Sequence, residues 1–467
     1  MAYPRTKIVC TLGPATTSRE ALRGLMEAGM NVARLNFSHG THEQHAERIA
    51  TIRSLAEELQ RPVAILGDLQ GPRIRIGELV APILLTEGMD LTLAPEDAAT
   101  GEEIPVTYAG LAGDVSSGDR ILIADGLLDL IVLDVDGVRV RARVLHGGPL
   151  SSHKGINLPG VPVSVPSITD KDREDIRFAI EQQVDYLALS FVRRAQDILD
   201  LRAMLPKEIL IVAKIEKDVA LTNIESIVRA TDAVMVARGD LGVELPFEEV
   251  PIAQKRIIAL SNRFGRPVIT ATQMLESMMQ NPRPTRAEAS DVANAILDGT
   301  DAVMLSGETA AGQYPRLAVE AMTRIITEIQ SHPPSWRRDE RMGRDGEVTT
   351  EHAIAAASAA AVRMLSAPCL AVITKSGASA RVVASHRPNV PILGLTDSVR
   401  TFRQLALVWG VIPELVPHCE TYEKMSRIGL ERVITRGLAQ RGDRVVFTAG
   451  VPFDTPGTTN MLKVEIA

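Results

Sequence analysis

The chain has 467 residues, more than one ordinary hydrophobic core accommodates, so we expect two or three domains. Hydrophobic residues make up 45% and charged residues 23% of the sequence, which is the range of a soluble globular protein. The net charge of -7 gives no electrostatic reason to bind nucleic acid or an anionic membrane. Three cysteines without metal-ligand spacing argue against a disulfide framework, and no apolar run reaches membrane-spanning length. The N-terminal apolar stretch is too short for a signal peptide, so the expected location is cytoplasmic.

Short apolar runs alternate with helical patterns through the first part of the chain. The tetrapeptide Asp-Ala-Val-Met occurs at 232–235 and at 301–304, an offset of 69 residues, or two units of about 35, a common size for a strand plus a helix. The eight apolar runs that fit this unit are 8–12, 32–37, 63–69, 186–192, 210–216, 233–238, 267–272 and 302–306. Helical patterns at 19–28 and 42–59 follow the first two runs. Eight parallel strands alternating with helices predict an α/β fold, a (β/α)8 TIM barrel, whose active site lies at the carboxyl ends of the strands.

One connection in this barrel is far too long for a loop. Roughly 90 residues separate the third strand from a helix that begins near Asp170, and they contain short alternating segments at 120–123, 128–133 and 138–144. This pattern predicts a small β-barrel domain inserted at the catalytic rim, where it would act as a lid.

A polar stretch with mixed charges follows the barrel and predicts a solvated linker. Beyond it, an Ala-rich helix at 353–365 and strands at 370–374, 391–395 and 444–449 predict an open α/β domain with parallel strands. The expected boundaries are 1–70 and 161–331 for the barrel, 71–160 for the inserted β domain, 332–349 for the linker and 350–467 for the C-terminal α/β regulatory domain.

Three charged residues follow two of the predicted strands. Lys214 and Glu216 stand two residues apart at the end of one apolar run, and Asp240 closes the next. Side chains at i and i+2 of a strand share one face, so we expect Lys214 and Glu216 to project together, with Asp240 at the same rim. An ammonium beside two carboxylates can hold a divalent cation and still stabilise developing negative charge. For any single pair, the simpler interpretation is an ordinary salt bridge.

Polar groups also stand at the carboxyl ends of other predicted strands. They are Arg34, Asn36, Ser38 and His39 at the second strand, Asp68, Arg73 and Arg75 at the third, Ser190 and Arg193 at the fourth, Thr270, Thr272 and Gln273 at the seventh, and Ser306, Glu308 and Thr309 at the eighth. Each one alone is explained by helix capping or by a salt bridge. Their gathering at one predicted rim favours a functional site.

The segment Gly239-Asp240-Leu241-Gly242 adds a different device to this rim. A glycine turn that enters a helix leaves backbone N–H groups that can hold a carboxylate or a phosphate. A divalent-metal site, several guanidiniums, such a turn and a buried lysine together fit phosphoryl transfer between anionic small molecules. The sequence contains neither a Walker A motif nor G-x-G-x-x-G, which argues against a P-loop or Rossmann nucleotide site.

Six long segments carry most of these residues. They are ARLNFSHG (33–40), GDLQGPRIR (67–75), AKIE (213–216), ARGDLGVELP (237–246), TATQMLESM (270–278) and MLSGETAAG (304–312). Together with GTTNMLKVE (457–465) they closely resemble the pyruvate kinase family, in family order and nearly end to end. The resemblance implies a Mg²⁺-dependent phosphotransferase, with Mn²⁺ as an alternative metal, that makes pyruvate and ATP from phosphoenolpyruvate and ADP in the last step of glycolysis.

The resemblance implies a role for each matching residue. Glu216 and Asp240 would ligate the metal, and Lys214 would stabilise the phosphoryl group in flight and the enolate left behind. The N–H groups around Gly239 and Asp240, with the Thr272 hydroxyl, would hold the substrate carboxylate. Thr272 would also lie on the route by which the enolate is protonated. Arg34 would contact the transferring phosphate, and the residues that would line the nucleotide side are Asn36, His39, Arg75 and Lys171.

Asn36, Ser38 and Asp68 match the family's monovalent-cation site, completed by the carbonyl of the next residue. Many potassium-dependent relatives have TKGPE where this chain has LQGPR (69–73), so a guanidinium, Arg73, replaces an acid. Its fixed positive charge could replace the cation, and we expect that K⁺ is not required. In the alternative, Arg73 points to solvent, pairs with a lid carboxylate and leaves the cation site functional.

The loop at 374–379 joins a strand to a helix in the C-terminal domain, so hydroxyl and N–H groups converge at a helix N-terminus. Relatives in the resembled family bind sugar phosphates or nucleotides here. The resemblance therefore implies an effector site at Thr374, Ser376, Gly377 and Ser379, and it also implies a homotetramer. The simpler interpretation of the loop is helix capping by Ser376 or Ser379.

Two other functions remain open from the residues alone. A barrel lyase or mutase acting on pyruvate-like substrates would use the same metal, although the lid and the nucleotide-side residues favour a second anionic substrate. A catalytically inactive metabolite sensor would not need Lys214, Glu216, Asp240 and Thr272. Pyruvate formation measured with and without ADP separates the kinase from the lyase.

Overall fold

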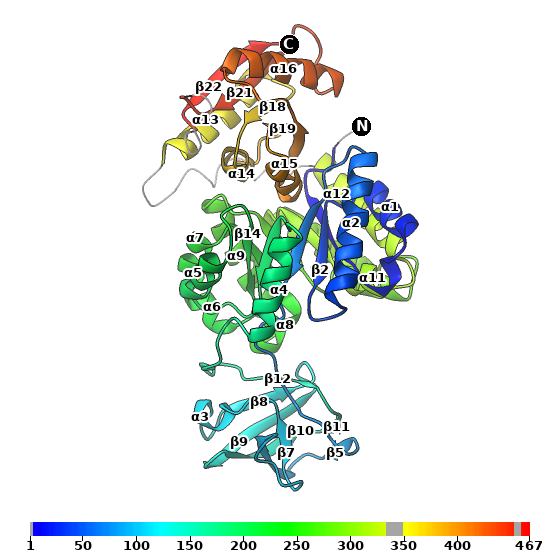
Figure 1. Cartoon of the computed structure of the whole chain (residues 1–467), viewed down its shortest axis with the longest axis vertical. Helices are drawn as coiled ribbons and strands as arrows, with labels where there is room; N and C mark the ends of the chain where they lie inside the picture. The colour runs from blue at the N-terminus through cyan, green and yellow to red at the C-terminus, as the bar shows by residue number, and fades with distance from the viewer. Residues whose placement is uncertain (1–2, 333–348, 453–458) are drawn as a thin grey trace.

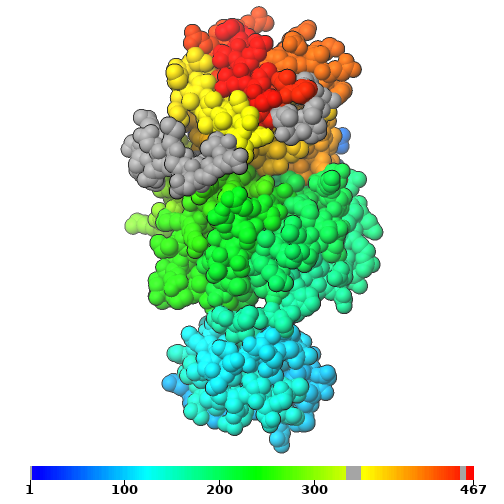
Figure 2. Space-filling model, turned by 90° about the vertical axis from the view of Figure 1, so that its left-hand side faces the viewer, coloured from blue at the N-terminus to red at the C-terminus, as the bar shows by residue number. Residues whose placement is uncertain are grey.

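The computed structural model describes residues 3–332, 349–452 and 459–467. Three parts are stacked along the long axis, with the β-rich insertion at one end, the barrel in the middle and the C-terminal part at the other end (Figure 1). The perpendicular view in Figure 2 shows the same order. The predicted linker, apart from its two end residues, and the first two residues of the 457–465 motif lie outside the described residues.

The central part is a closed barrel of eight parallel strands in the order β1-β17-β16-β15-β14-β13-β3-β2. The strands are β1 Lys7–Thr11, β2 Val32–Asn36, β3 Ala64–Asp68, β13 Tyr186–Leu189, β14 Leu210–Ile215, β15 Ala233–Ala237, β16 Val268–Ala271 and β17 Ala302–Leu305. Each of the eight expected strands is present, and the predicted (β/α)8 barrel is confirmed. Strand β13 ends three residues earlier than expected, and Phe191 beyond it has a left-handed φ of 54° that no regular strand adopts.

Helices surround the barrel and begin at residues that cap them. The helices are α1 Arg19–Ala28, α2 His42–Glu58, α4 Asp170–Glu181, α5 Ala195–Met204, α6 Asp218–Thr222, α7 Ile224–Ala230, α8 Arg238–Glu244, α9 Val250–Arg263, α10 Arg286–Asp298, α11 Gly307–Ala310 and α12 Pro315–Ser331. The side chains of Ser18, Thr41, Thr169 and Thr285 accept N–H groups at the starts of α1, α2, α4 and α10. No helix among the described residues is long and apolar enough to cross a membrane.

The aspartates that begin the repeated tetrapeptide form the same kind of contacts at the amino ends of their strands, and Asp185 shares these contacts. Asp185, Asp232 and Asp301 each precede a barrel strand, and each carboxylate accepts a backbone N–H from the start of a neighbouring strand over 2.8–3.0 Å. Their arginine partners are Arg53, Arg202 and Arg387, respectively. The carboxylates therefore satisfy backbone donors that the strand ladder leaves open, which stabilises the barrel.

The inserted part is a small β structure with its own core. Its seven-stranded sheet has the order β4-β12-β8-β9-β10-β6-β7, and a bridge between Ile76 and Val106 brings its two edges together. The strands are β4 Ile74–Arg75, β6 Asp90–Pro95, β7 Ile104–Val106, β8 Arg120–Ile123, β9 Leu128–Asp136, β10 Arg139–His146 and β12 Gly155–Asn157, beside the pair β5 Ile83–Leu85 and β11 Gly148–Leu150 and the helix α3 Leu111–Asp114. This sheet is the small barrel-like insertion that the sequence predicts.

The C-terminal part is a five-stranded sheet in the order β20-β19-β18-β21-β22. The strands are β18 Leu370–Ile373, β19 Ile392–Thr396, β20 Val411–Leu415, β21 Arg444–Ala449 and β22 Met461–Ile466, and the helices are α13 Thr350–Leu365, α14 Ala378–Ser385, α15 Val399–Gln404 and α16 Tyr422–Thr435. The three predicted strands are parallel as expected, and β22, which the sequence does not predict, pairs antiparallel with β21. Residues 450–460 are too few for a crossover helix, so the chain returns in the opposite direction.

The C-terminal part packs against the amino ends of the barrel strands, opposite the lid. The Lys7 ammonium at the start of β1 donates to the Val411 carbonyl over 2.7 Å. The Tyr186 hydroxyl at the start of β13 donates to the Gln404 carbonyl over 2.7 Å. The barrel therefore separates the predicted catalytic rim from the predicted effector loop.

Candidate active site

The Lys214 side chain lies at the centre of the carboxyl rim of the barrel. Its ammonium donates to the Ser190 hydroxyl at 2.7 Å and lies 2.9 Å from a carboxylate oxygen of Glu216 and 3.2 Å from one of Asp68. The predicted pairing of Lys214 with Glu216 is confirmed. Burial alone would lower the pKa of Lys214, but the carboxylates of Asp68 and Glu216 outweigh burial and raise that pKa. Lys214 is therefore held as a cation among these carboxylates.

Arg34 supplies a second cation beside the first. Its Nε donates to Asp68 Oδ2 at 2.6 Å, and its Nη1 donates to the Thr11 hydroxyl at 2.9 Å. Burial favours a raised pKa for Asp68, but the charges of Lys214 and Arg34 prevail and hold the pKa of this carboxyl below its usual range. Asp68 is thus an ionised carboxylate that links strands β2 and β14 across the barrel.

Glu216 and Asp240 form the part of the rim that suits a metal. Glu216 Oε2 accepts the Phe191 N–H at 2.7 Å, and the Glu216 side chain is buried. Burial raises the pKa of Glu216, Lys214 opposes this shift, and the nearby Asp240 charge adds to it. Three carboxylates thus face two cations, Lys214 and Arg34, and the excess negative charge fits a divalent cation.

The rim offers few side chains that could bind a metal. The described residues contain no group of three or more His, Cys, Asp or Glu side chains arranged around a metal position. Mg²⁺ is usually bound through one or two carboxylates, with water and substrate phosphate oxygens completing its octahedron. Glu216 and Asp240 are therefore the carboxylates of this rim that could hold a divalent cation.

Thr272 and Gly239 meet where strands β15 and β16 end. The Gly239 N–H donates to Thr272 Oγ1 at 2.7 Å, and this hydroxyl donates to the Ala271 carbonyl at 2.6 Å. Thr272 has a left-handed φ of 66°, which is an outlier for a β-branched residue. Such strain persists only where the surrounding structure enforces it, and it clusters at functional sites. The structure thus places this hydroxyl and the first turn of α8 together, as the sequence predicts.

The expected nucleotide residues divide between the barrel and the lid. Asn36 Oδ1 accepts the Ser38 N–H at 3.1 Å, which shapes the loop after β2, and the His39 carbonyl accepts from His45. Lys171 joins this loop through the Phe37 carbonyl at 2.7 Å. Its ammonium also lies 2.7 Å from Asp175, so it is partly committed to an ion pair on its own helix. Arg75 stands apart from them on β4 of the lid.

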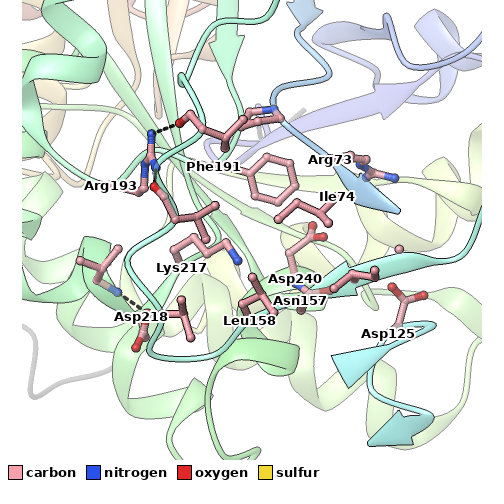
Figure 3. Close-up of a pocket in the computed structure, with 17 residues that line it drawn as sticks. Arg73, Ile74, Asp125, Asn157, Leu158, Phe191, Arg193, Lys217, Asp218 and Asp240 are labelled. Atoms are coloured by element: carbon pink, nitrogen blue, oxygen red, sulfur yellow. Dashed lines mark hydrogen bonds between the residues drawn. The ribbon is translucent and has the colours of Figure 1, made fainter. Parts of the chain in front are cut away.

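Two hollows open between the lid and the barrel. The one in Figure 3 has a volume of about 80 Å³ and is lined by lid residues such as Asn157 and by barrel residues such as Lys217. The other has a volume of about 580 Å³ and extends toward Phe247. Both hollows include Asp125 of the lid and Asp240 of the barrel. Asp240 therefore lies at the cleft between the lid and the barrel.

Two contacts of these residues are absent from the sequence predictions. Thr11 ends strand β1 and binds Arg34, and the rule applied to the other strand ends would have found it. Ser190 was recognised only as a strand end, yet its hydroxyl accepts from Lys214 and donates to the Leu69 carbonyl at 2.8 Å. No local pattern reveals this bridge, because its partners come from three different strands.

The predicted effector loop has a defined shape. The Gly377 N–H donates to Thr374 Oγ1 at 3.0 Å, and Gly377 has a left-handed φ of 78°. Helix α14 follows without a side-chain cap, so the capping interpretation of Ser376 and Ser379 is wrong. The Ser379 hydroxyl instead lies 2.6 Å from the Thr459 hydroxyl. Two groups of the loop therefore bind each other, and the Ser379 hydroxyl has its partner outside the loop.

A parallel barrel with acids and a lysine at its carboxyl rim, beside a β lid, fits the class of phosphotransferases. Comparison with known proteins makes this specific. The family model for the pyruvate kinase barrel domain matches residues 3–319, and that for the pyruvate kinase alpha/beta domain matches residues 352–465. The chain belongs to the pyruvate kinase family. It transfers the phosphoryl group of phosphoenolpyruvate to ADP and gives pyruvate and ATP.

Full-length relatives agree with the family assignment. The chain is 49% identical over 472 residues to a pyruvate kinase of Geobacillus stearothermophilus, covering 99% of this chain and 80% of that protein. It is 46% identical over 469 residues to a Staphylococcus epidermidis pyruvate kinase, with the same coverage. A crystal structure of a Cryptosporidium parvum pyruvate kinase is similar with a TM-score of 0.94 at 36% identity, covering 99% of this chain and 96% of that one. These matches favour the kinase over the lyase or mutase that the residues left open.

Proposed function

We propose that this kinase works with Mg²⁺, or Mn²⁺ in its place, held by Glu216 and Asp240. The observation that carries the proposal is the excess of three carboxylates over two cations around Lys214. When bound, the divalent cation neutralises phosphate oxygens and polarises the transferring group. Lys214 and Arg34 then neutralise the remaining charge of the phosphoryl group, which needs little covalent help to move.

The same groups account for the rest of the reaction. The phosphorus–oxygen bond to enolpyruvate breaks, a bond to a terminal phosphate oxygen of ADP forms, and the enolate carbon takes a proton. The Gly239 and Asp240 N–H groups, with the Thr272 hydroxyl, hold the substrate carboxylate. Lys214 stabilises the enolate oxygen, and Thr272 lies on the proton route. The hydrogen bond from Gly239 to Thr272 supports this assignment, because it brings the N–H group and the hydroxyl next to each other at the rim.

Asn36, His39, Arg75 and Lys171 form the nucleotide side in this proposal. The loop after β2 and the start of α4 carry three of them within one bonded cluster, supported by the contact from Lys171 to the Phe37 carbonyl. Arg75 belongs to the lid, so it approaches the nucleotide when the lid closes.

We further propose that K⁺ is not required. Asp68, one acid of the monovalent site formed with Asn36 and Ser38, already faces Arg34 and Lys214. The carbonyl that would complete that site accepts the Ser190 hydroxyl. Arg73 is exposed and lines the same hollow as Asp240 (Figure 3), and in the described part of the chain it forms no ion pair with a lid carboxylate. Its positive charge is therefore free to face the substrates.

The regulatory proposal concerns Thr374, Ser376, Gly377 and Ser379. A sugar phosphate or nucleotide bound there would raise activity at subsaturating phosphoenolpyruvate, and Ser379→Glu should abolish that rise by like-charge repulsion. A panel of sugar phosphates and nucleoside monophosphates without effect on half-saturation would contradict this site.

The assembly and location are also proposals. We propose a cytoplasmic homotetramer, divided at the boundaries predicted above. Light scattering under assay conditions tests the tetramer, and a stable monomer of 50.5 kDa would contradict it.

The primary test is pyruvate formation from phosphoenolpyruvate and ADP, scanned over Mg²⁺ and Mn²⁺. Glu216→Gln should raise the metal concentration needed for half-maximal rate, because it removes a charged ligand without changing its size. Glu308→Gln is the matched control, since Glu308 is a buried rim carboxylate that accepts only backbone N–H groups in the described structure. Equal metal requirements in the two variants would contradict the assigned metal site.

A further inference from the structure

Two chain segments, 69–73 and 158–169, connect the lid to the barrel, and a buried carboxylate stands beside the second of them. Glu244 is the last residue of helix α8, and its side chain is 1% exposed. Its Oε1 accepts from the Asn157 side-chain amide at 3.1 Å and from the Lys217 ammonium at 2.5 Å. Its Oε2 has no hydrogen-bond partner in the described structure.

These contacts join three pieces of the molecule at one atom. Asn157 ends β12, the last strand of the lid. Lys217 directly follows Glu216, and its ammonium also lies 5.9 Å from the centre of the Phe191 ring. Glu244 lies one helical turn after Asp240 on α8, so the two carboxylates share a face of that helix. Figure 3 shows Asn157 and Lys217 around one hollow together with Asp240.

We propose that Glu244 is a positioning residue that couples the orientation of the lid to the metal-binding carboxylates. The inference rests on the proposed metal site at Glu216 and Asp240. Asn157 and Lys217 bind the same oxygen of Glu244. A rotation of the lid that moves Asn157 therefore changes the ion pair between Glu244 and Lys217. That change reaches Glu216 through the adjacent peptide, and it reaches Asp240 through helix α8.

The ordinary interpretation is that Glu244 only neutralises Lys217. A buried acid that only neutralised Lys217 would need no hydrogen-bond donor from the lid. Its second carboxylate oxygen would also have a hydrogen-bond partner nearby. Arg193 offers the contrast of a purely structural clamp at the same hinge. Its guanidinium donates to the Val163 and Val165 carbonyls and to the Ser167 hydroxyl, which holds the returning chain without touching a metal carboxylate.

The test uses Asn157→Leu in the full-length protein, because this change keeps the side-chain volume, removes the donor and leaves the Lys217–Glu244 pair intact. Arg143→Ala is the control, since it breaks an exposed lid ion pair with Asp90 that is remote from the barrel. Hydrogen–deuterium exchange of the peptide spanning 154–166 is measured with and without Mn²⁺. Mn²⁺ affinity is measured independently by electron paramagnetic resonance.

Coupling is reciprocal, so Mn²⁺ should slow exchange at 154–166 in the parent, and the Asn157→Leu variant should lose that response and bind Mn²⁺ about fivefold more weakly. The Arg143→Ala control should keep both parental values. The proposal is overturned if the parent shows no metal-dependent slowing, if Asn157→Leu keeps it, or if Arg143→Ala loses it as well. The Glu216→Gln variant distinguishes a failure of the coupling from a failure of the proposed metal site. Unchanged Mn²⁺ affinity in that variant would contradict the metal site itself.

Discussion

Buried ion pairs occur at both ends of the barrel, and their surroundings differ. At the amino end, the two carboxylate oxygens of Asp301 lie 2.8 and 3.1 Å from the Arg387 guanidinium. Arg387 also donates to the Gly299 carbonyl and the Asn262 amide oxygen, and it lies 4.7 Å from the centre of the Trp409 ring. One planar cation therefore fits one carboxylate and its neighbours in a fixed geometry.

At the carboxyl end, one ammonium serves several acceptors. Lys214 is shared by Asp68, Glu216 and the Ser190 hydroxyl, and Asp240 adds further negative charge. The left-handed φ angles of Phe191 and Thr272 occur at this end too. The comparison shows that buried ion pairs can differ in how well their charges are balanced. A matched pair stabilises the barrel, whereas the unmatched cluster carries excess negative charge, which fits the metal site that we propose.

The largest expected effect comes from removing the shared cation. Lys214→Met keeps the side-chain length and removes the charge that stabilises the moving phosphoryl group, so turnover should fall by about 10³-fold or more. Substrate binding should change far less. Steady-state kinetics check this, and turnover within about tenfold of the parent would show that Lys214 does not have this role.

Breaking the pair of Arg387 and Asp301 should lower the stability of the protein and leave its catalytic activity unchanged. Arg387→Met leaves Asp301 as an uncompensated buried charge, which costs about 3–5 kcal/mol and lowers the midpoint of thermal unfolding. The exposed pair of Arg143 and Asp90 is the control, because Arg143→Ala should cost about 1 kcal/mol or less. A similar shift in both variants would break the comparison between buried and exposed pairs.

The dependence of activity on K⁺ tests the charge balance at the carboxyl rim. In a sodium- and potassium-free tetraalkylammonium buffer the parent should be nearly fully active, whereas Arg73→Glu should create a K⁺ requirement of about a hundredfold, or about 2.7 kcal/mol. The reason is that an acid at 73 would replace the guanidinium that offsets substrate charge. Activation of the parent by a hundredfold or so on adding K⁺ would contradict the proposal.

The smallest effect concerns Lys7, a lysine at the amino end for which the described residues provide no acidic partner. Burial lowers the pKa of Lys7 from 10.5 to about 8. Between these two pH values the unfolded chain keeps the proton that the native protein has lost, so this residue makes stability rise with pH across the window. Thermal unfolding of Lys7→Met should lack that part of the rise. Parallel pH profiles for parent and variant would show that Lys7 titrates normally.

Much of the fold follows from patterns that span only a few residues. Apolar runs and helical periodicity predict the eight barrel strands, and α1 and α4 begin where the sequence predicts. The i, i+2 spacing predicts the contact between Lys214 and Glu216, and the barrel rule places Asp240 at the same rim. The roles of these residues stay predictions, since their positions agree with the chemistry without testing it.

Other features lie beyond local patterns. Strand β20 was not predicted, and β22 runs against its neighbour because the chain between them is short. The Ser190 bridge, the lid contact from Asn157 to Glu244 and the burial of Lys7 have no local signature. The repeated Asp-Ala-Val-Met correctly indicated repeating units, but the partners of its aspartates became visible only in three dimensions.

The sequence by itself determined the order of strands and helices, the inserted lid, the carboxyl-rim acids and the family. These properties depend on side-chain alternation, helix caps and motifs, which act over a few neighbouring residues. Tertiary structure alone decided which groups meet between distant parts of the chain. Lys7 meets Val411, and Asp301 meets Arg387, because the C-terminal part packs on the amino end of the barrel. Burial and the pKa shifts that follow from it depend on such distant packing, so no local pattern in the chain records them.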